Sequence, residues 1–145
     1  MKKISLVVAV ASLALASHVL AADAKPAPKK RVVLDLSSEA LIDSADAKAL
    51  VSDAIPAAVW KLYPSSKWGF FSQVVGGFTH DKICVVTARV MLAPLTVTNG
   101  IIMRPASRAA AFDAKPNATE EECRGIARAK LKEATESVVA SLVKS

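Results

Sequence analysis

The sequence predicts an α+β domain: a long N-terminal helix, a two- or three-stranded antiparallel sheet and a long C-terminal helix, in that order. Three observations support this order. An apolar stripe at helical spacing runs through 47–62, a strand-like alternation fills Lys82–Leu92, and a capping box followed by a second apolar stripe fills 119–142. We expect both helices on one face of the sheet and one disulfide holding the domain together.

The chain begins with the pattern of a secretory signal peptide. Two lysines precede the apolar run Ile4–Ala16, and Val19-Leu20-Ala21 suits cleavage after Ala21. The run is short for a membrane span, and no stop-transfer pattern follows it. The sequence therefore predicts three parts: a signal peptide over 1–21, a basic Pro/Lys tail over 22–31, and a single α+β domain over 32–145. Location in the periplasm, or secretion, is expected after cleavage, without stable membrane insertion.

The net charge of +6 belongs mainly to the two N-terminal parts. Lys2 and Lys3 lie in the predicted signal, and the tail holds four basic residues and one acidic residue. From Val32 onward the chain is close to neutral, so the basicity does not indicate a nucleic-acid-binding surface.

The first predicted elements are a short edge strand over Val32–Leu36 and a helix. Asp43 suits the N-cap position, and the apolar stripe continues to Leu62 in unchanged phase. Pro56 should kink or restart the helix, and Pro64 should end it.

Three strands are expected next: Trp68–Phe78, Lys82–Leu92 and Ile101–Phe112. Gly76-Gly77 suggests a bulge or a close backbone approach, and a turn at 79–81 joins the first two strands. Asn99-Gly100 is a strong hairpin signal. A two-residue turn there pairs residues whose numbers sum to 199, which would place Pro94 opposite Pro105 although neither has an N–H to donate. Either the ladder breaks there or the register differs.

From Cys84 onward the even positions of the central strand are all apolar, so Cys84 should point into the core. Cys123 is the only other cysteine, and it opens the apolar stripe of the last helix. An even pair of cysteines in an oxidising compartment predicts a disulfide between them.

The last helix has the clearest signals. Thr119 and Glu122 form a capping box, and Glu120 and Glu121 suit the positive end of the helix dipole. Its apolar stripe is predicted to be Cys123, Ala127, Leu131, Ala134, Val138 and Leu142.

Motifs for catalysis or cofactor binding are missing from the sequence. His80 is the only histidine after the signal peptide, and with bridged cysteines no metal site of several His or Cys ligands can be assembled. Neither a serine-nucleophile elbow nor a phosphate-binding glycine loop is present. We therefore expect no metal and no cofactor, and favour a non-enzymatic role, while any two acids could still meet in space.

Two candidate binding surfaces remain. Trp60, Tyr63 and Trp68 gather where the first helix meets the sheet, and they form either a core corner or an interface. If the register sums to 199, Arg89, Met91, Arg104 and Arg108 share the face opposite Cys84. Such arginines could hold carboxylate or phosphate groups, or simply belong to a solvated sheet face.

The sequence thus favours a non-catalytic periplasmic binding or accessory protein, for example an inhibitor or immunity protein for an envelope-acting enzyme. Its partner would be a protein or an anionic envelope component and not a nucleic acid, and the sequence leaves its oligomeric state open. The alternatives are a small envelope hydrolase that uses carboxylates or His80, and a structural envelope component that assembles with itself through a sheet edge.

Overall fold

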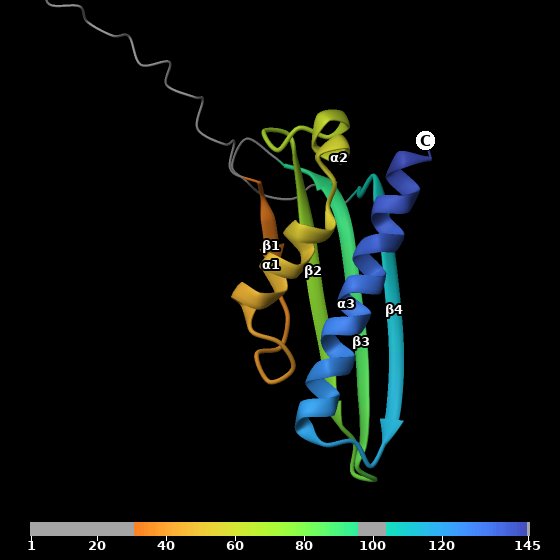
Figure 1. The fold of residues 1–145 in the computed structure, drawn as a ribbon. Coiled ribbons are helices and arrows are strands. Elements are labelled where there is room, and N and C mark those ends of the chain that lie inside the picture. Colours follow the sequence, from red (N-terminus) through yellow and green to blue (C-terminus); the bar gives the residue numbers. More distant parts are fainter. Residues whose placement is uncertain (1–30, 96–103, 145) are drawn as a thin grey trace, which may run out of the picture.

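The computed structural model describes residues 31–95 and 104–144. Its elements are β1 (Val33–Asp35), α1 (Ser44–Ala54), α2 (Ala57–Leu62), β2 (Trp68–Phe78), β3 (Ile83–Pro94), β4 (Ser107–Pro116) and α3 (Glu120–Val143), arranged as Figure 1 shows. The strands form one sheet in the order β1-β2-β3-β4. The fold is α+β as predicted. The signal peptide, most of the basic tail and the Asn99-Gly100 turn lie outside the described residues, and their predictions are untested.

The sheet is larger than predicted and is mixed. β2, β3 and β4 pair antiparallel, whereas β1 pairs with β2 in parallel. Two parallel strands need a long crossover between them, and the segment containing α1 and α2 supplies it. The predicted edge strand therefore joins the sheet as a fourth strand, and the expectation of a two- or three-stranded antiparallel sheet was wrong.

The predicted long N-terminal helix is two shorter helices. Ile55 is extended, because the residue before a proline is pushed out of the helical region. Pro56, the N-cap of α2, is extended as well. The chain restarts as α2 in a new direction. As a result Val59 is buried but Leu62 is 63% exposed, so the stripe does not continue in phase across Pro56.

β3 is the central strand of the fold, and its alternation is confirmed. Cys84, Val86, Ala88, Val90 and Leu92 are at most 1% exposed and face the helices. Of the two alternatives that the prolines left open, the structure has the register that sums to 199, with Met91 opposite Arg108. The ladder stops at the pair Leu92 and Ser107, so the two prolines never face each other as a hydrogen-bonded pair. The last strand accordingly begins later than the predicted Ile101 and extends to Pro116.

The two glycines near the end of β2 have positive φ values of 142° and 145°. A Cβ atom at Gly76 would lie 1.9 Å from the carbonyl oxygen of Val85. The pairing continues through both glycines without a bulge, so the close backbone approach is the correct interpretation.

β1 is held against β2 by a small hydrogen-bond network. The Asp35 carboxylate accepts hydrogen bonds from the hydroxyls of Ser72 (2.7 Å) and Ser37 (2.6 Å). The Ser37 hydroxyl oxygen in turn accepts from the Val74 N–H at 2.9 Å. Ser72 is buried, and this network satisfies its hydroxyl. A strand of only three residues is thereby fixed in register at the sheet edge.

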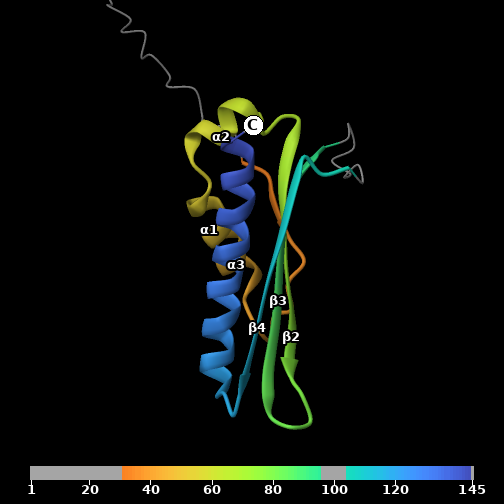
Figure 2. The ribbon, with the colours of Figure 1, turned by 90° about the vertical axis from the view of Figure 1, so that its right-hand side faces the viewer.

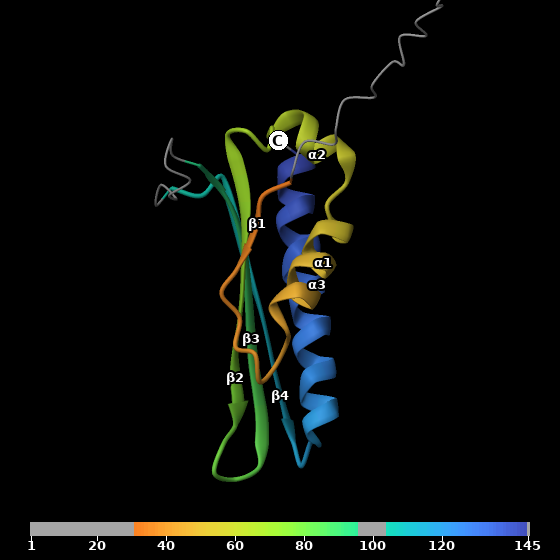
Figure 3. The ribbon, with the colours of Figure 1, turned by 90° about the vertical axis from the view of Figure 1, so that its left-hand side faces the viewer.

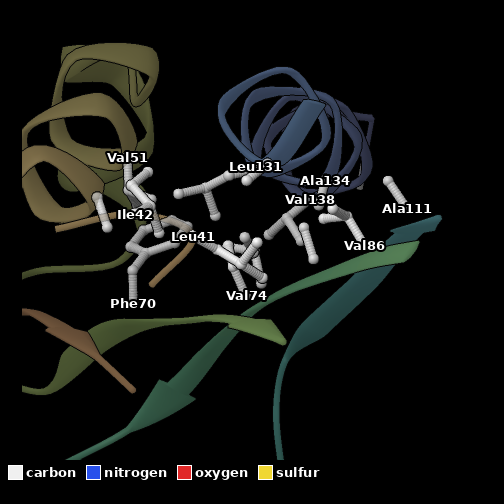
Figure 4. Close-up of a cluster of buried hydrophobic side chains, with 14 of the residues drawn as sticks. Leu41, Ile42, Val51, Phe70, Val74, Val86, Ala111, Leu131, Ala134 and Val138 are labelled. Carbon is white, nitrogen blue, oxygen red and sulfur yellow. The ribbon is translucent and has the colours of Figure 1, made fainter. Parts of the chain in front are cut away.

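All three helices lie on one side of the sheet, and Figures 2 and 3 show the other side without a covering layer among the described elements. The core fills the space between the helices and the sheet, where Phe70 and Val74 meet Val51 and Leu131 (Figure 4). The whole predicted stripe of α3 is buried. We call the side of the sheet that faces the helices the inner face and the opposite side the outer face.

The disulfide joins Cys84 and Cys123, whose Cα atoms are 5.7 Å apart. It ties the first turn of α3 to the inner face near the start of β3. The sequence separation is 39 residues, so the chain-entropy estimate of its stabilisation is about 4 kcal/mol.

We predict that the double variant Cys84→Ser/Cys123→Ser loses about 4 kcal/mol of unfolding free energy, because the unfolded chain regains its loop entropy. Urea denaturation of the oxidised protein and the variant measures the difference. Adding reductant should destabilise the natural protein but leave the variant unchanged. Equal midpoints for the two proteins without reductant would contradict this prediction.

The N-terminus of α3 has the predicted capping box. The Thr119 hydroxyl oxygen accepts from the Glu122 N–H at 3.2 Å, and the Glu122 carboxylate accepts from the Thr119 N–H at 2.8 Å. Lys115 donates a further hydrogen bond to this carboxylate at 2.7 Å. Lys115, followed by the Thr119 N–H, holds the pKa of Glu122 below its ordinary value.

We therefore predict that the Glu122 carboxylate, followed by NMR, titrates below the usual glutamate value of about 4.3. A lowered folded-state pKa means that the ion stabilises the fold above the unfolded pKa. That stabilisation is lost as the pH falls through the folded pKa. Lys115→Met should raise the midpoint, whereas Lys132→Met, at a lysine paired with Glu136, should leave it unchanged. An unchanged midpoint in Lys115→Met would disprove the assigned cause.

Candidate functional site: the outer face of the sheet

The strand pairing places the outer-face side chains in rows across the sheet. One row is Leu34, Phe71, Met91 and Arg108. The next is Gln73, Arg89 and Ala110, and the third is Val75, Thr87 and Phe112. Each row follows from the pairing because directly opposed residues project to the same side. Arg89, Met91 and Arg108 therefore share the face opposite Cys84, as the predicted register implies.

This face is mainly apolar, and much of it is exposed. Phe112 is 62% exposed, Leu34 38% and Val75 36%. Leu36, just past the end of β1, continues the alternation and is 66% exposed. Phe71 and Met91 lie half-buried between them. Gln73, Thr87 and Arg89 stand among these apolar residues. Several large apolar side chains exposed on one face of a small domain are typical of an interaction surface.

The charged groups of the outer face all have one sign. Arg89 and Arg108 are exposed, and none of the three rows contains an aspartate or glutamate. Among the described residues, every ion pair belongs to α3 and its neighbours or to the tip of the β2-β3 hairpin. Asp113, the one acidic residue of β4, lies on the inner side, where its carboxylate is 3.6 Å from the Lys130 Nζ atom. The outer face is therefore apolar and cationic.

A shallow depression of 460 Å³ lies between β3 and β4, lined by Arg89, Met91, Arg108 and Ala110 together with Val90 and Ala109. Arg89 is directly opposite Ala110, and Arg108 is opposite Met91. The two arginines are thus diagonal neighbours, and residues in such a pair lie about 7–8 Å apart, close enough for long side chains to meet. The other residues that line the depression are all apolar.

Arg104 lies beyond the end of the ladder and belongs to none of the rows. It lines a second depression of 510 Å³ together with Arg108. Arg108 thus lines both depressions, and Arg104 lies at the edge of the outer face. The predicted group of three arginines is close to one site, but only Arg89 and Arg108 project from the sheet.

The aromatic corner packs against the core. Trp60 meets Phe70 edge-on with ring centroids 5.4 Å apart, and Tyr63 meets Trp68 in the same manner at 5.2 Å. All three predicted corner residues are partly buried against the core cluster. The Trp60 indole N–H is buried and forms no hydrogen bond with the described residues. Since this polar tip does not face solvent, we leave the corner out of the proposed surface.

His80 stands at the tip of the β2-β3 hairpin with its side chain fully exposed. Its Nδ1 atom is 3.7 Å from the Asp81 carboxylate. Within 31–95 and 104–144, no group of three His, Cys, Asp or Glu side chains is placed to hold a metal ion. In the same ranges no helix is long and apolar enough to cross a membrane.

The sequence interpretation missed the apolar part of the outer face. Leu34, Phe71 and Phe112 were not proposed as site residues. A signal was present: Leu34 and Leu36 alternate with Val33 and Asp35, but a three-residue strand does not reveal which side is buried. The Asp35 side chain accepts a hydrogen bond from the buried Ser72 hydroxyl and therefore lies on the inner side. Its neighbour Leu34 consequently projects from the outer face.

Comparison with known proteins gives little further information. No family model matches the chain, and no curated protein matches it. Among solved structures, a variant of the PelC dodecamer from Paraburkholderia phytofirmans has a TM-score of 0.44 at 13% identity, covering 74% of this chain and 86% of that one. A DUF330 protein from Xanthomonas campestris has a TM-score of 0.40 at 10% identity, covering 78% and 83%. Similarity at this level assigns neither a family nor a function.

We predict that the outer face contributes little to folding. Phe112→Ala should change the unfolding free energy by no more than about 0.5 kcal/mol, since the ring is largely in water. Phe70→Ala, on the inner face, should cost about 3–5 kcal/mol because it leaves a cavity. Urea denaturation compares the two variants. A cost of several kcal/mol for Phe112→Ala would mean that the outer face is part of the folding core.

Proposed function

We propose that the chain is an exported, non-catalytic binding or accessory protein of the cell envelope, and that the outer face is its contact surface. One observation carries the proposal: a four-stranded sheet has all its helices on one face, while its other face displays Leu34, Val75 and Phe112 to solvent. Water contact with such a surface is unfavourable, and a partner that covers it removes that cost.

The envelope location is supported by two independent features of the chain. The N-terminal pattern is that of a signal peptide, and the Cys84–Cys123 disulfide suits an oxidising compartment. An inhibitor or immunity protein for an envelope-acting enzyme is one concrete form of such a binder, because it needs only a rigid surface and no catalytic group.

The outer face also has the rigidity that a preformed surface requires. β2 and β3 pair over eleven residues each, and β3 and β4 over ten. The opposite side of β3 is packed against α3 and fastened by the disulfide. A partner would therefore lose little free energy in ordering this side of the contact.

The test is recovery of a partner from envelope extract on the immobilised mature domain, at low salt and with crosslinking. The variant Val75→Ser/Phe112→Ser removes apolar area from the outer face, and we expect it to lose the partner. Leu62→Ser is the matched control, since Leu62 is equally exposed on α2, away from the outer face. It should retain the partner. Repeated recovery of no partner, or full retention by the outer-face variant, would overturn the proposal.

A further inference from the structure

We infer that the partner of the outer face is an acidic amphipathic protein segment, one that presents carboxylates beside an apolar stripe. This inference rests on the proposed function and adds the chemistry of the partner. It starts from the two arginines that flank the depression between β3 and β4.

Arg89 and Arg108 are exposed, and neither forms an ion pair with a described residue. An apolar partner that covered Met91 and Phe112 would also take these guanidinium groups out of water. A buried charge without a counter-charge is strongly unfavourable. The partner must therefore supply anionic groups where the arginines lie, and carboxylates match the guanidinium fork with two parallel hydrogen bonds.

The same charges argue against the chain itself as the occupant. The predicted tail over 22–31 carries Lys25, Lys29, Lys30 and Arg31 against the single acid Asp23, so it would bring like charge to the outer face. A second copy stacked face to face would place arginines against an arginine-bearing surface with no acid in its rows. Like charges brought together in an interface are a means of rejecting a partner.

A lipid surface is a second source of negative charge, and the composition of the face argues against it. Clusters of about four to eight basic residues are typical of surfaces that bind anionic lipid. The outer face has two arginines among apolar groups, with Arg104 at its rim. A mixture of Phe, Met and Arg is instead the composition enriched at protein interfaces.

The dimensions of the face suit a helix. β4 has ten residues and so spans about 33 Å, and a helix of about 20 residues is 30 Å long. α3 already packs in this manner along β3 and β4 on the inner face (Figures 1 and 2). An amphipathic helix laid along the depression would place its apolar stripe over Met91 and its flanking acids beside Arg89 and Arg108.

The experiment titrates the isotope-labelled mature protein with three synthetic helical peptides of about 20 residues. All three have the same leucine stripe, flanked by glutamate, glutamine or lysine. We expect the glutamate peptide to shift the Met91 methyl signal and the amides of β2, β3 and β4. It should bind at least about tenfold more tightly than the glutamine peptide, and rising salt should weaken it.

Charge reversal then tests the named residues. Arg89→Glu/Arg108→Glu should weaken binding of the glutamate peptide at least about tenfold and improve binding of the lysine peptide. The matched control is Lys48→Glu/Lys61→Glu, two exposed residues on α1 and α2 that have no ion pair with a described residue. It changes the net charge equally and should leave binding by either peptide within about twofold.

Four results would overturn the inference. The first is equal binding of the three peptides or binding of none, and the second is equal loss of affinity in the control variant. The third is a response of the outer-face signals to vesicles of phosphatidylglycerol and phosphatidylcholine but to no peptide. The fourth is a concentration-dependent dimer that uses this face. An envelope partner that survives Arg89→Glu/Arg108→Glu but is lost in Val75→Ser/Phe112→Ser would overturn the acidic chemistry alone and leave the proposed function intact.

Discussion

The burial of β3 on one side only is the constraint on which the rest of this molecule depends. The even-numbered side chains of β3 are buried on the side that α3 covers. The disulfide between Cys84 and Cys123 fixes that helix at one end of the strand. The odd-numbered side chains of β3, among them Thr87, Arg89 and Met91, have no layer of described structure above them. A sheet with a fixed pleat cannot exchange these two sets without shifting its whole register.

Much of the fold could be predicted because its signals are local. The capping box at Thr119 and Glu122, the stripe of α3 and the alternation of β3 each follow from short-range spacing, and the structure confirms them. The hairpin signal at Asn99-Gly100 suggested the register of β3 and β4 but left it open, because that register would set Pro94 opposite Pro105. What could not be predicted depends on contacts between distant segments: the parallel pairing of β1 with β2 requires Asp35 to meet Ser72, 37 residues away.

The candidate site shows the same division. Arg89 and Arg108 could be assigned to one face from the register alone, whereas Leu34 and Phe71 could not be added until the direction of β1 was known. A proline also explains why the predicted long N-terminal helix is two helices. Pro56 clearly interrupts a helix in the sequence, but the new direction of α2 depends on the extended backbone of Ile55, which turns Leu62 into solvent.

The disulfide bears on the export that we propose for this chain, because such a bond forms and persists in an oxidising compartment. Without that bond the fold lacks about 4 kcal/mol, so its folded-to-unfolded ratio is lower by roughly three orders of magnitude. Polypeptides that are threaded through a secretion channel must pass it unfolded, and a precursor with reduced thiols offers less resistance to threading. Oxidation after export would then form the disulfide, so that the full stability of the fold is reached only outside the cytoplasm.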